Sequence, residues 1–310
     1  MSVIRIGSRK SKLAMWQTET VVRMLESAGF TTEIITMETK GDKILDTSIA
    51  KIGSKGVFTE ELEEKLAQGS IDIAVHSAKD MPSRLPEGFS LIAFTEREKV
   101  NDVLLSRNGA LSIDDPGAAI RIGTSSVRRV ALLRHFYPHV EVVDMRGNLQ
   151  TRVKKLDGGA CDALMLAYAG VKRMQYDDLI VKTFPVDEFV PPVGQGSIAI
   201  EAASSLSAAK REKIRACLNH RDSETCLLAE RAYLKRLEGG CSIPAFALAR
   251  LSGDTLTLSA GLISLDGRTE IRKTISGQRQ NARELGRDAG THILDNGGRE
   301  LLAEIRRQQA

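Results

Sequence analysis

One short segment carries side chains that could do chemistry directly after an apolar run. In IDIAVHSAKDMPSRLP (residues 71–86), Lys79 and Asp80 follow a run typical of a buried strand. A carboxylate beside an ammonium group at the wall of a cleft can stay ionised, accept an N–H hydrogen bond and stabilise a developing cation. The same pair could instead form a solvated turn before Pro82, and the segment alone leaves both interpretations open.

A second candidate site is the run GTSSVRR, in which Ser125 and Ser126 can cap a helix whose first turn holds Arg128 and Arg129. Positive side chains oppose the helix dipole at that end, so an anion beside them is favoured. An anionic ligand would supply that charge. A neighbouring carboxylate, or exposure of both guanidinium groups to solvent, would also explain the pattern.

Other arginines fall at expected loops and helix starts, namely Arg9, Arg146, Arg152 and Arg173. Each one alone is an ordinary surface charge. If the elements that carry them align, they would line one cleft with guanidinium groups, which bind carboxylates through paired hydrogen bonds.

Cys241 differs from the other cysteines in its surroundings. The segment LEGGCSIP places it on a loop with little side-chain cover, where a reagent or a cofactor could reach the thiol. A cysteine that fills space beside a tight turn would have the same spacing. Cys161, Cys217 and Cys226 lie in apolar or helical stretches and are expected to be inert thiols.

Composition excludes several classes of protein. Hydrophobic residues make up 42% and charged residues 27%, which is typical of a folded globular protein. A net charge of +4 with 4% aromatic residues disfavours nucleic-acid binding. The cysteines and histidines form no metal-ligand spacing, so no metal site is expected. Without an apolar run of signal-peptide or membrane-spanning length, we expect a cytoplasmic protein that does not bind membranes.

The elements that must position these residues occur twice along the chain. Residues 3–7 indicate a buried strand followed by a serine-capped helix, and residues 120–138 repeat that plan. Gly69 and Gly159 then each end a helix before another apolar strand. Two such echoes in the same order predict two related α/β lobes, with a ligand crevice at the carboxyl ends of their strands.

The remaining segments suggest a loop, a crossover and a third domain. Residues 38–60 are rich in Gly and Lys until a helix from about Thr59, and we expect a mobile surface loop near the ligand. Residues 186–202 would suit a crossover back to the first lobe. Helical composition from about residue 211, followed by alternation around the turn signal Asp266-Gly267, predicts a smaller α/β domain.

These motifs resemble, in order and over nearly the whole chain, the porphobilinogen deaminase (hydroxymethylbilane synthase) family. The segments that carry the resemblance are GSRKSKLAMWQ, TKGDKILD, IGSKGVFTEELE, DIAVHSAKDMP, GTSSVRR, RGNLQTRVKKLD, LAYAGVKR, PPVGQGSIAIE and ERAYLKRLEGGCSIP. Lys12, where proline is common, and Pro244-Ala245-Phe246 after the cysteine depart from the family pattern without touching the expected chemistry.

The resemblance implies an α/β enzyme of three domains. The first two would resemble type II periplasmic binding proteins, and the third would be a small α/β domain with an antiparallel sheet. The expected boundaries are 1–95 with about 196–213 for the first domain, 96–195 for the second and 214–310 for the third. The resemblance also implies a monomer with no obligatory protein partner.

The implied activity is a transferase reaction of haem (tetrapyrrole) biosynthesis. Four porphobilinogen molecules would condense head to tail with release of ammonia on a covalently bound dipyrromethane, and hydrolysis would release hydroxymethylbilane. The alternative is a non-catalytic carboxylate-binding protein of periplasmic-binding-protein type. A hydrolase with a cysteine nucleophile lacks an identifiable histidine partner in any motif.

The resemblance assigns roles to single residues. Asp80 would be catalytic, and Cys241 would carry dipyrromethane through a thioether. Further cofactor contacts are expected from Lys79, Asp80, Ser126, Arg128, Arg129 and Arg152. Substrate contacts are expected from Arg9, Ser11, Arg146, Arg152 and Arg173. Lys51, Lys55 and Phe58 would lie on the loop over the cleft. Each pyrrole ring brings an acetate and a propionate, which an arginine-rich cleft would suit.

Overall fold

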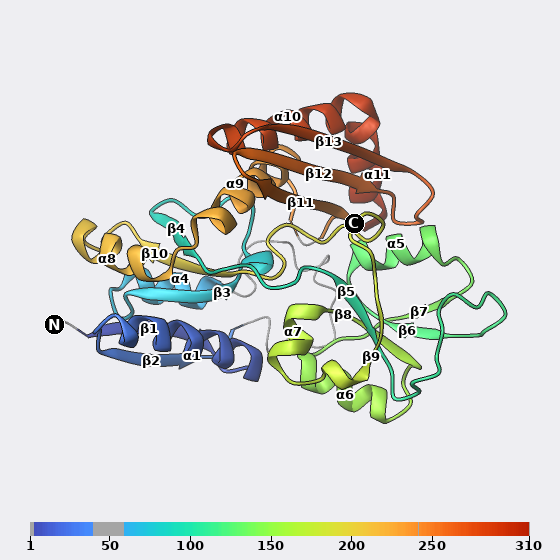
Figure 1. Ribbon diagram of the computed structural model, residues 1–310, viewed down its shortest axis with the longest axis horizontal. Coiled ribbons are helices and arrows are strands. Elements are labelled where there is room, and N and C mark those ends of the chain that lie inside the picture. The colour runs from blue at the N-terminus through green and yellow to red at the C-terminus, as the bar shows by residue number, and fades with distance from the viewer. Residues whose placement is uncertain (1–2, 40–58, 241, 310) are drawn as a thin grey trace.

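The structure is a computed structural model that describes residues 3–39, 59–240 and 242–309. Its elements form three units, each with its own β-sheet (Figure 1). We call them the first lobe, the second lobe and the C-terminal unit, in the order in which their sheets begin. The two lobes lie side by side, and the C-terminal unit lies across the top of both in Figure 1.

The first lobe is built on a five-stranded sheet with the order β2-β1-β3-β10-β4. Its strands are β1 (Ile4–Arg9), β2 (Thr32–Met37), β3 (Ile73–Ser77), β4 (Phe89–Phe94) and β10 (Ile198–Ala203). Strand β1 pairs in parallel with β2 and β3, whereas β10 runs antiparallel to β3 and β4. The helices packed on this sheet are α1 (Lys12–Ser27), α4 (Glu60–Ala67) and α8 (Ala208–Leu218).

The second lobe repeats this plan with a five-stranded sheet in the order β7-β6-β8-β5-β9. Its strands are β5 (Asp102–Leu105), β6 (Arg121–Gly123), β7 (Glu141–Val143), β8 (Ala163–Ala167) and β9 (Ile180–Thr183). Its helices are α5 (Val127–Phe136), α6 (Leu149–Asp157) and α7 (Tyr168–Arg173). Strands β6, β7 and β8 are parallel, and β5 is antiparallel to β8 and β9. The predicted internal repeat is therefore confirmed.

In both lobes, a glycine with a positive φ ends the helix that precedes a central strand of the sheet. Gly69 follows α4 with a φ of +66°, and Gly159 follows α6 with a φ of +74°. Glycine adopts this left-handed backbone without a Cβ clash, so it can end a helix sharply. The chain then enters β3 or β8, both of which lie between apolar clusters on the two faces of their sheets. The predicted helix ends and buried strands are confirmed.

The C-terminal unit combines an antiparallel sheet with helices. The strands are β11 (Ala245–Ser252), β12 (Thr255–Ile263) and β13 (Glu270–Gln278), paired in that order. The helices are α9 (Arg221–Arg236), α10 (Ala282–Ile293) and α11 (Arg299–Gln309). The expected fold class, two similar α/β lobes with a smaller α/β unit, is confirmed.

The turn between β12 and β13 contacts the second lobe. Gly267 has a φ of +77°, and a Cβ there would lie 2.6 Å from the carbonyl oxygen of Ala131 in α5. His135 Nδ1 donates to the Gly267 carbonyl oxygen at 2.7 Å. The predicted Asp266-Gly267 turn is therefore present, and its glycine is required both by the backbone conformation and by the close approach to α5.

Two crossover segments, residues 95–101 and 184–197, connect the lobes and run side by side. Arg97 Nε donates to the Gln195 carbonyl oxygen at 2.8 Å, and Arg97 also forms a paired contact with Glu230 of α9 at 2.5 and 3.1 Å. Glu230 is fully buried and accepts backbone N–H groups from Gly194 and Ala249. One carboxylate thus joins the crossover to α9 and β11.

Candidate active site

The first wall of the candidate site lies where β1 and β3 end. Strand β3 leads directly into the short helical turn η1 (Ala78–Asp80), which carries Lys79 and Asp80. A pocket at this edge brings Asp80 together with Arg9, Ser11 and His76. Parallel strands end at the same edge of a sheet, which is why residues about 70 positions apart in the chain meet here.

Helix α1 contributes the other side of this pocket. Ser11 is its N-cap, and its hydroxyl accepts the N–H of Ala14 at 3.3 Å. Gln17 also lines the pocket and donates from Nε2 to the hydroxyl of Ser77 at 2.8 Å. The sequence analysis did not single out Gln17. Its position six residues after the N-cap, at the same end of the helix, is the signal that could have pointed to it.

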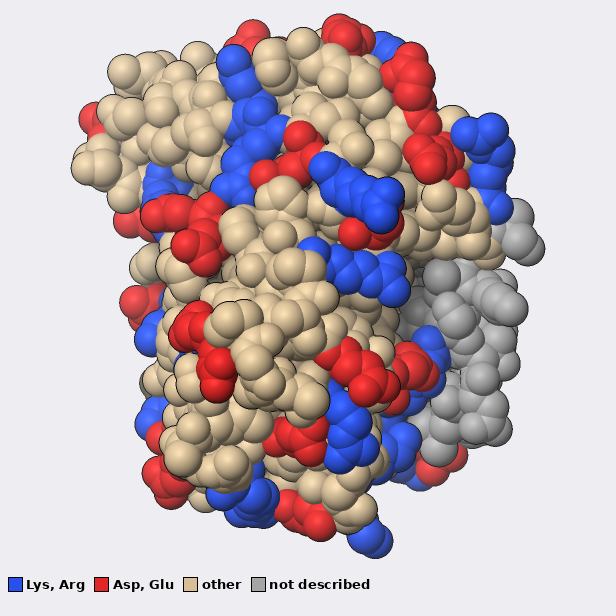
Figure 2. Space-filling view, turned by 90° about the vertical axis from the view of Figure 1, so that its right-hand side faces the viewer, with Lys and Arg blue, Asp and Glu red and all other residues tan. Residues whose placement is uncertain are grey.

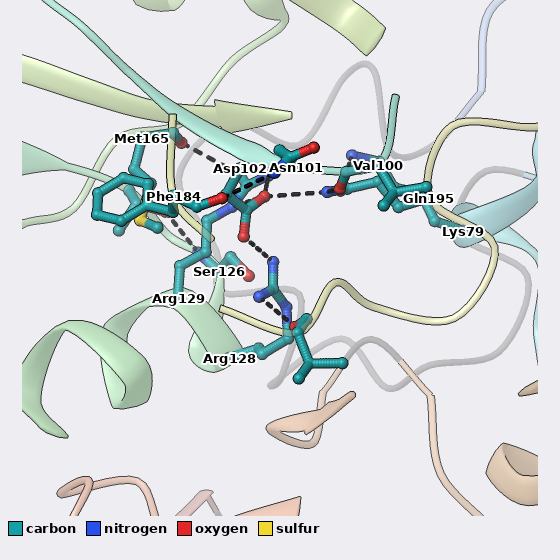
Figure 3. Close-up of polar contacts among 12 residues, drawn as sticks. Lys79, Val100, Asn101, Asp102, Ser126, Arg128, Arg129, Met165, Phe184 and Gln195 are labelled. Atoms are coloured by element: carbon teal, nitrogen blue, oxygen red, sulfur yellow. Dashed lines mark hydrogen bonds and ion pairs between the residues drawn. The ribbon is translucent and has the colours of Figure 1, made fainter. Parts of the chain in front are cut away.

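The two arginines of GTSSVRR converge on one buried carboxylate, Asp102 at the start of β5 (Figure 3). Arg128 Nη2 lies 2.5 Å from Asp102 Oδ2, and Arg129 donates to Oδ1 from Nη2 at 2.8 Å and from Nε at 3.1 Å. Of the explanations offered by the sequence, a neighbouring carboxylate is therefore present. Asp102 itself was missed, although a carboxylate that opens an apolar strand must find a partner when it is buried.

Burial alone would raise the pKa of Asp102, but the two guanidinium groups outweigh it and hold that pKa well below its usual range. One carboxylate does not satisfy both arginines. Arg128 Nη1 and Arg129 Nη1 turn to the backbone carbonyl oxygens of Val190 and Met165. Arg128 Nε is buried and has no hydrogen-bond partner among the described residues.

Gln195 connects this arginine pair to the first lobe. Its side-chain Nε2 donates to Asp102 Oδ1 at 3.0 Å and to the Val100 carbonyl oxygen at 2.7 Å, while its Oε1 accepts from Lys79 Nζ at 3.3 Å (Figure 3). Burial, together with Arg129, lowers the pKa of Lys79 to about 8. The sequence analysis did not identify Gln195, because nothing in its local pattern shows that the crossover passes between the lobes.

Arg152 of α6 reaches the same region from the second lobe. Its Nε donates to the Gly147 carbonyl oxygen at 2.8 Å. Burial and the charge of Arg129 lower its pKa to about 10, whereas Asp80 raises it. Asp80 therefore lies within electrostatic reach of a cation from the opposite lobe. Together with Lys79, Arg128 and Arg129, Arg152 brings a fourth positive side chain to the region of Asp80 and Asp102.

This concentration of positive side chains bears on which ligands the site could bind. Ammonium and guanidinium groups that converge on one region can bind carboxylates through charge-assisted hydrogen bonds. The residues present therefore fit a group that brings several carboxylates, as a dipyrromethane with its acetate and propionate side chains would.

The other predicted site residues are distributed as follows. Arg173 of α7 lies over the Trp16 ring at 5.3 Å and donates to the Gly196 carbonyl oxygen at 2.7 Å. Arg146 lies 3.3 Å from Asp144, and Ser126 is the N-cap of α5. The remaining predictions, Cys241, Lys51, Lys55 and Phe58, lie outside the described residues.

The three described cysteines are unpaired thiols. Cys161 and Cys226 are buried, whereas Cys217 is partly exposed. Burial, with the charge of Glu230, raises the pKa of Cys226 to about 11, and burial also raises the pKa of Cys161. A thiol with a raised pKa is a poor nucleophile at neutral pH, which agrees with the expectation of inert thiols at these two positions.

Three further observations concern metal ligands, membrane-spanning helices and surface charge among the described residues. No group of three or more His, Cys, Asp or Glu side chains among them could hold a metal ion. No helix in residues 3–39, 59–240 and 242–309 is both long and apolar enough to cross a membrane. On the face shown in Figure 2, positive and negative side chains are interspersed.

Asp102→Asn is expected to lower the free energy of unfolding by about 3–5 kcal/mol, because it leaves two buried guanidinium groups without their anion. The wild-type carboxylate has a lowered pKa in the folded state. Its stabilising contribution is therefore present above the unfolded-state pKa of about 3.9 and is lost as the pH falls below that value. Urea unfolding at about pH 7 and about pH 3 measures both effects.

Asp157→Asn is the matched control, because Asp157 pairs with Arg107 at the surface at 2.8 Å. An exposed ion pair contributes little to stability, so this variant should unfold like the wild type. Equal losses of unfolding free energy in Asp102→Asn and Asp157→Asn would contradict the stabilising role assigned to Asp102.

The comparisons with known proteins agree along the whole chain. Residues 4–211 match the family described as "Porphobilinogen deaminase, dipyromethane cofactor binding domain". Residues 224–295 match "Porphobilinogen deaminase, C-terminal domain". The porphobilinogen deaminase of Desulfosudis oleivorans is 65% identical over 306 residues, covering 99% of each chain. That of Cytophaga hutchinsonii is 53% identical, covering 98% of this chain and 97% of its own.

Solved structures give a weaker comparison. The periplasmic VFT2 domain of Bordetella pertussis BvgS has 16% identity and a TM-score of 0.40, covering 69% of this chain and 92% of its own. The periplasmic aliphatic sulphonate binding protein SsuA from Escherichia coli has 13% identity and a TM-score of 0.40, covering 76% and 70%. Nothing about function follows from similarity at this level. The two matched stretches and the full-length relatives are decisive, and the chain belongs to the porphobilinogen deaminase family.

Proposed function

We propose that this enzyme is a porphobilinogen deaminase of haem biosynthesis, a transferase that condenses four porphobilinogen molecules and releases hydroxymethylbilane. The observation that carries this proposal is the 65% identity to a porphobilinogen deaminase over 99% of both chains. The convergence of Lys79, Arg128, Arg129 and Arg152 on one region supports a substrate with several carboxylates.

Asp80 is assigned the catalytic role. When ammonia leaves the aminomethyl group of porphobilinogen, positive charge develops on the pyrrole nitrogens. A carboxylate at the pocket wall can accept hydrogen bonds from those N–H groups. Its negative charge then stabilises the positive charge on the ring. The position of Asp80 at the end of β3, in a pocket that also contains Arg9 and Ser11, supports this role.

The family match makes dipyrromethane the cofactor, and we propose that Cys241 anchors it through a thioether. When bound, the dipyrromethane supplies a covalent primer with a free pyrrole carbon at which the chain can grow. Lys79, Ser126, Arg128, Arg129 and Arg152 would hold its carboxylates. These residues come from both lobes and converge on one region. This supports the assignment, because each of the two rings of the primer carries an acetate and a propionate group.

Substrate carboxylates are assigned to Arg9, Ser11, Arg146, Arg152 and Arg173. Guanidinium groups can bind a carboxylate through two parallel hydrogen bonds, which fixes orientation as well as position. Arg9 and Ser11 belong to the first lobe and the other three to the second. This division supports binding between the lobes. Lys51, Lys55 and Phe58 keep their proposed place on a loop over the cleft.

We also infer the finer features expected from the resemblance. The domain boundaries would be 1–95 with about 196–213, then 96–195 and 214–310. The membership of β10 in the first sheet supports the first of these, while α8, which packs on that sheet, continues past the proposed boundary to Leu218. The enzyme would be a cytoplasmic monomer that needs no protein partner and binds neither nucleic acid nor membranes.

The purified enzyme should release one ammonia for each porphobilinogen it consumes and yield a four-ring product by mass spectrometry. The alternative, a non-catalytic carboxylate-binding protein, predicts that porphobilinogen binds and is recovered unchanged. Binding by calorimetry without ammonia release would therefore reject the proposed activity.

A further inference from the structure

A group of four ionisable side chains adjoins the pocket that contains Asp80, and one of them, His76, lines that pocket. His76 of β3 and Glu201 of β10 are 6% and 0% exposed, and Glu63 of α4 is 7% exposed. The fourth member is Arg231 of α9, whose Nη1 is buried. We call these residues the buried charge cluster. They come from two strands of the first lobe, the helix that covers those strands and the C-terminal unit.

Glu201 is the centre of the cluster. In the antiparallel pair of β10 and β3, Glu201 lies opposite Ala74 and Ala199 lies opposite His76, so Glu201 and His76 are diagonal neighbours on one face. Glu201 Oε2 lies 3.0 Å from His76 Nε2. Neither carboxylate oxygen of Glu201 makes an aligned hydrogen bond within the described residues. Glu201 and His76 are therefore in close contact without an aligned hydrogen bond.

Arg231 approaches the cluster from the C-terminal unit and also touches the Asp80 segment. Its Nη2 donates to the carbonyl oxygen of Pro82 at 2.8 Å, and its Nη1 has no hydrogen-bond partner among the described residues. Burial lowers the pKa of Arg231 to about 10, and the charge of Glu201 opposes this effect. The two side chains therefore attract each other across the boundary between the first lobe and α9.

The cluster holds both ends of the segment that carries Asp80. His76 lies four residues before Asp80 and faces Glu201, while Pro82 lies two residues after Asp80 and is bound by Arg231. The upstream anchor thus contacts Glu201 directly, and the charge of Glu201 also acts on Arg231, the downstream anchor. Glu63 faces the same charges, and burial together with Glu201 raises its pKa.

A buried ion cluster is a weak source of stability, because desolvation offsets much of the attraction and apolar side chains often serve as well. It can, however, hold its members in one arrangement. We propose that Glu201 and Arg231 are positioning residues, which clamp residues 77–82 at both ends and so hold the Asp80 carboxylate at the pocket wall. This inference rests on the proposed role of Asp80.

The test uses full-length holoenzyme and three variants of the clamp. Glu201→Gln keeps the shape and removes the charge, and Arg231→Met removes the charge and the donors but keeps an apolar stem. Arg231→Lys keeps the charge and loses the planar fork. The matched control is Glu224→Gln, since Glu224 also lies on α9 and pairs with Arg215 at 2.6 Å, away from the Asp80 segment.

Two measurements are made on each protein, amide hydrogen exchange of residues 77–82 and steady-state turnover of porphobilinogen. Exchange should be at least about tenfold faster in Glu201→Gln and Arg231→Met, because opening this segment becomes easier. Their kcat should fall about tenfold or more with KM changed less than about threefold, because small misplacement of a catalytic group lowers the rate of the chemical step. Arg231→Lys should be intermediate.

The control Glu224→Gln should match the wild type in both measurements, even where its thermal unfolding changes. Wild-type exchange of residues 77–82 in all three clamp variants would overturn the proposal. So would a kcat loss from Glu201→Gln that persists in full in an Asp80→Asn background, because the clamp would then act on something other than Asp80. Full activity of Asp80→Asn itself would reject the role of Asp80, and the exchange result would still report on the clamp.

Discussion

Asp80→Asn is expected to lower kcat for porphobilinogen by about 100-fold or more while the fold is retained. The amide has the shape of the carboxylate but lacks its charge. Asp80 is the acidic side chain among the described residues that line the pocket, so its loss removes from that wall the negative charge that would oppose charge developing on a pyrrole ring. Steady-state turnover measures the effect, and circular dichroism with thermal unfolding shows whether the fold is intact.

The loss should be specific to this carboxylate. Asp288→Asn, an exposed position on α10, should have wild-type turnover. Asp80→Glu keeps the charge but moves it by one methylene, so its activity should lie between those of the wild type and Asp80→Asn. Near-normal turnover of Asp80→Asn would remove Asp80 from its proposed role.

Cys241→Ala is expected to abolish both the covalent cofactor and turnover. Intact-mass measurement should show the wild-type protein heavier than its sequence by two condensed pyrrole units, and the variant at its sequence mass. Ehrlich's aldehyde reagent should colour the wild type and leave the variant colourless. The physical reason is that a thioether needs an accessible thiol, which the LEGGCSIP pattern predicts at Cys241.

Cys217→Ala is the control for this experiment, because Cys217 is a partly exposed thiol elsewhere in the chain and should leave the mass increment unchanged. Incubating each protein with porphobilinogen before measurement covers preparations that lack the cofactor. A wild-type protein that still has its unmodified sequence mass, or a Cys241→Ala variant that gains the increment, would contradict the assignment.

Local patterns predicted the repeated architecture correctly. The apolar runs IAV and ALML are buried strands because parallel strands covered on both faces need apolar side chains throughout. Gly69, Gly159 and Gly267 have the positive φ that their positions in the pattern indicate. These features depend on neighbours a few residues away, and such interactions can be recognised in the sequence.

The motif order likewise identified the family, and it identified Lys79, Asp80, Arg128 and Arg129 as candidate site residues. What each charged side chain contacts is a different kind of information. The GTSSVRR motif indicated that an anion should be near, and it could not distinguish a ligand from a protein carboxylate. The carboxylate is Asp102, which lies 26 residues from Arg128 in sequence and 2.5 Å away in space.

The sequence of this protein therefore determined its fold class, its repeat and the residue types available for binding a multi-carboxylate ligand. Only the tertiary structure decided which charges neutralise one another and which remain for a ligand. Asp102 meets the two arginines because β5 crosses into the second sheet antiparallel to β8. Gln195 contacts Lys79 because the crossover at residues 184–197 passes between the lobes. Arg231 contacts Pro82 because α9 packs beside the crossover at residues 95–101. Pairings of this kind depend on how distant strands and helices pack, and no local pattern in the chain records that packing.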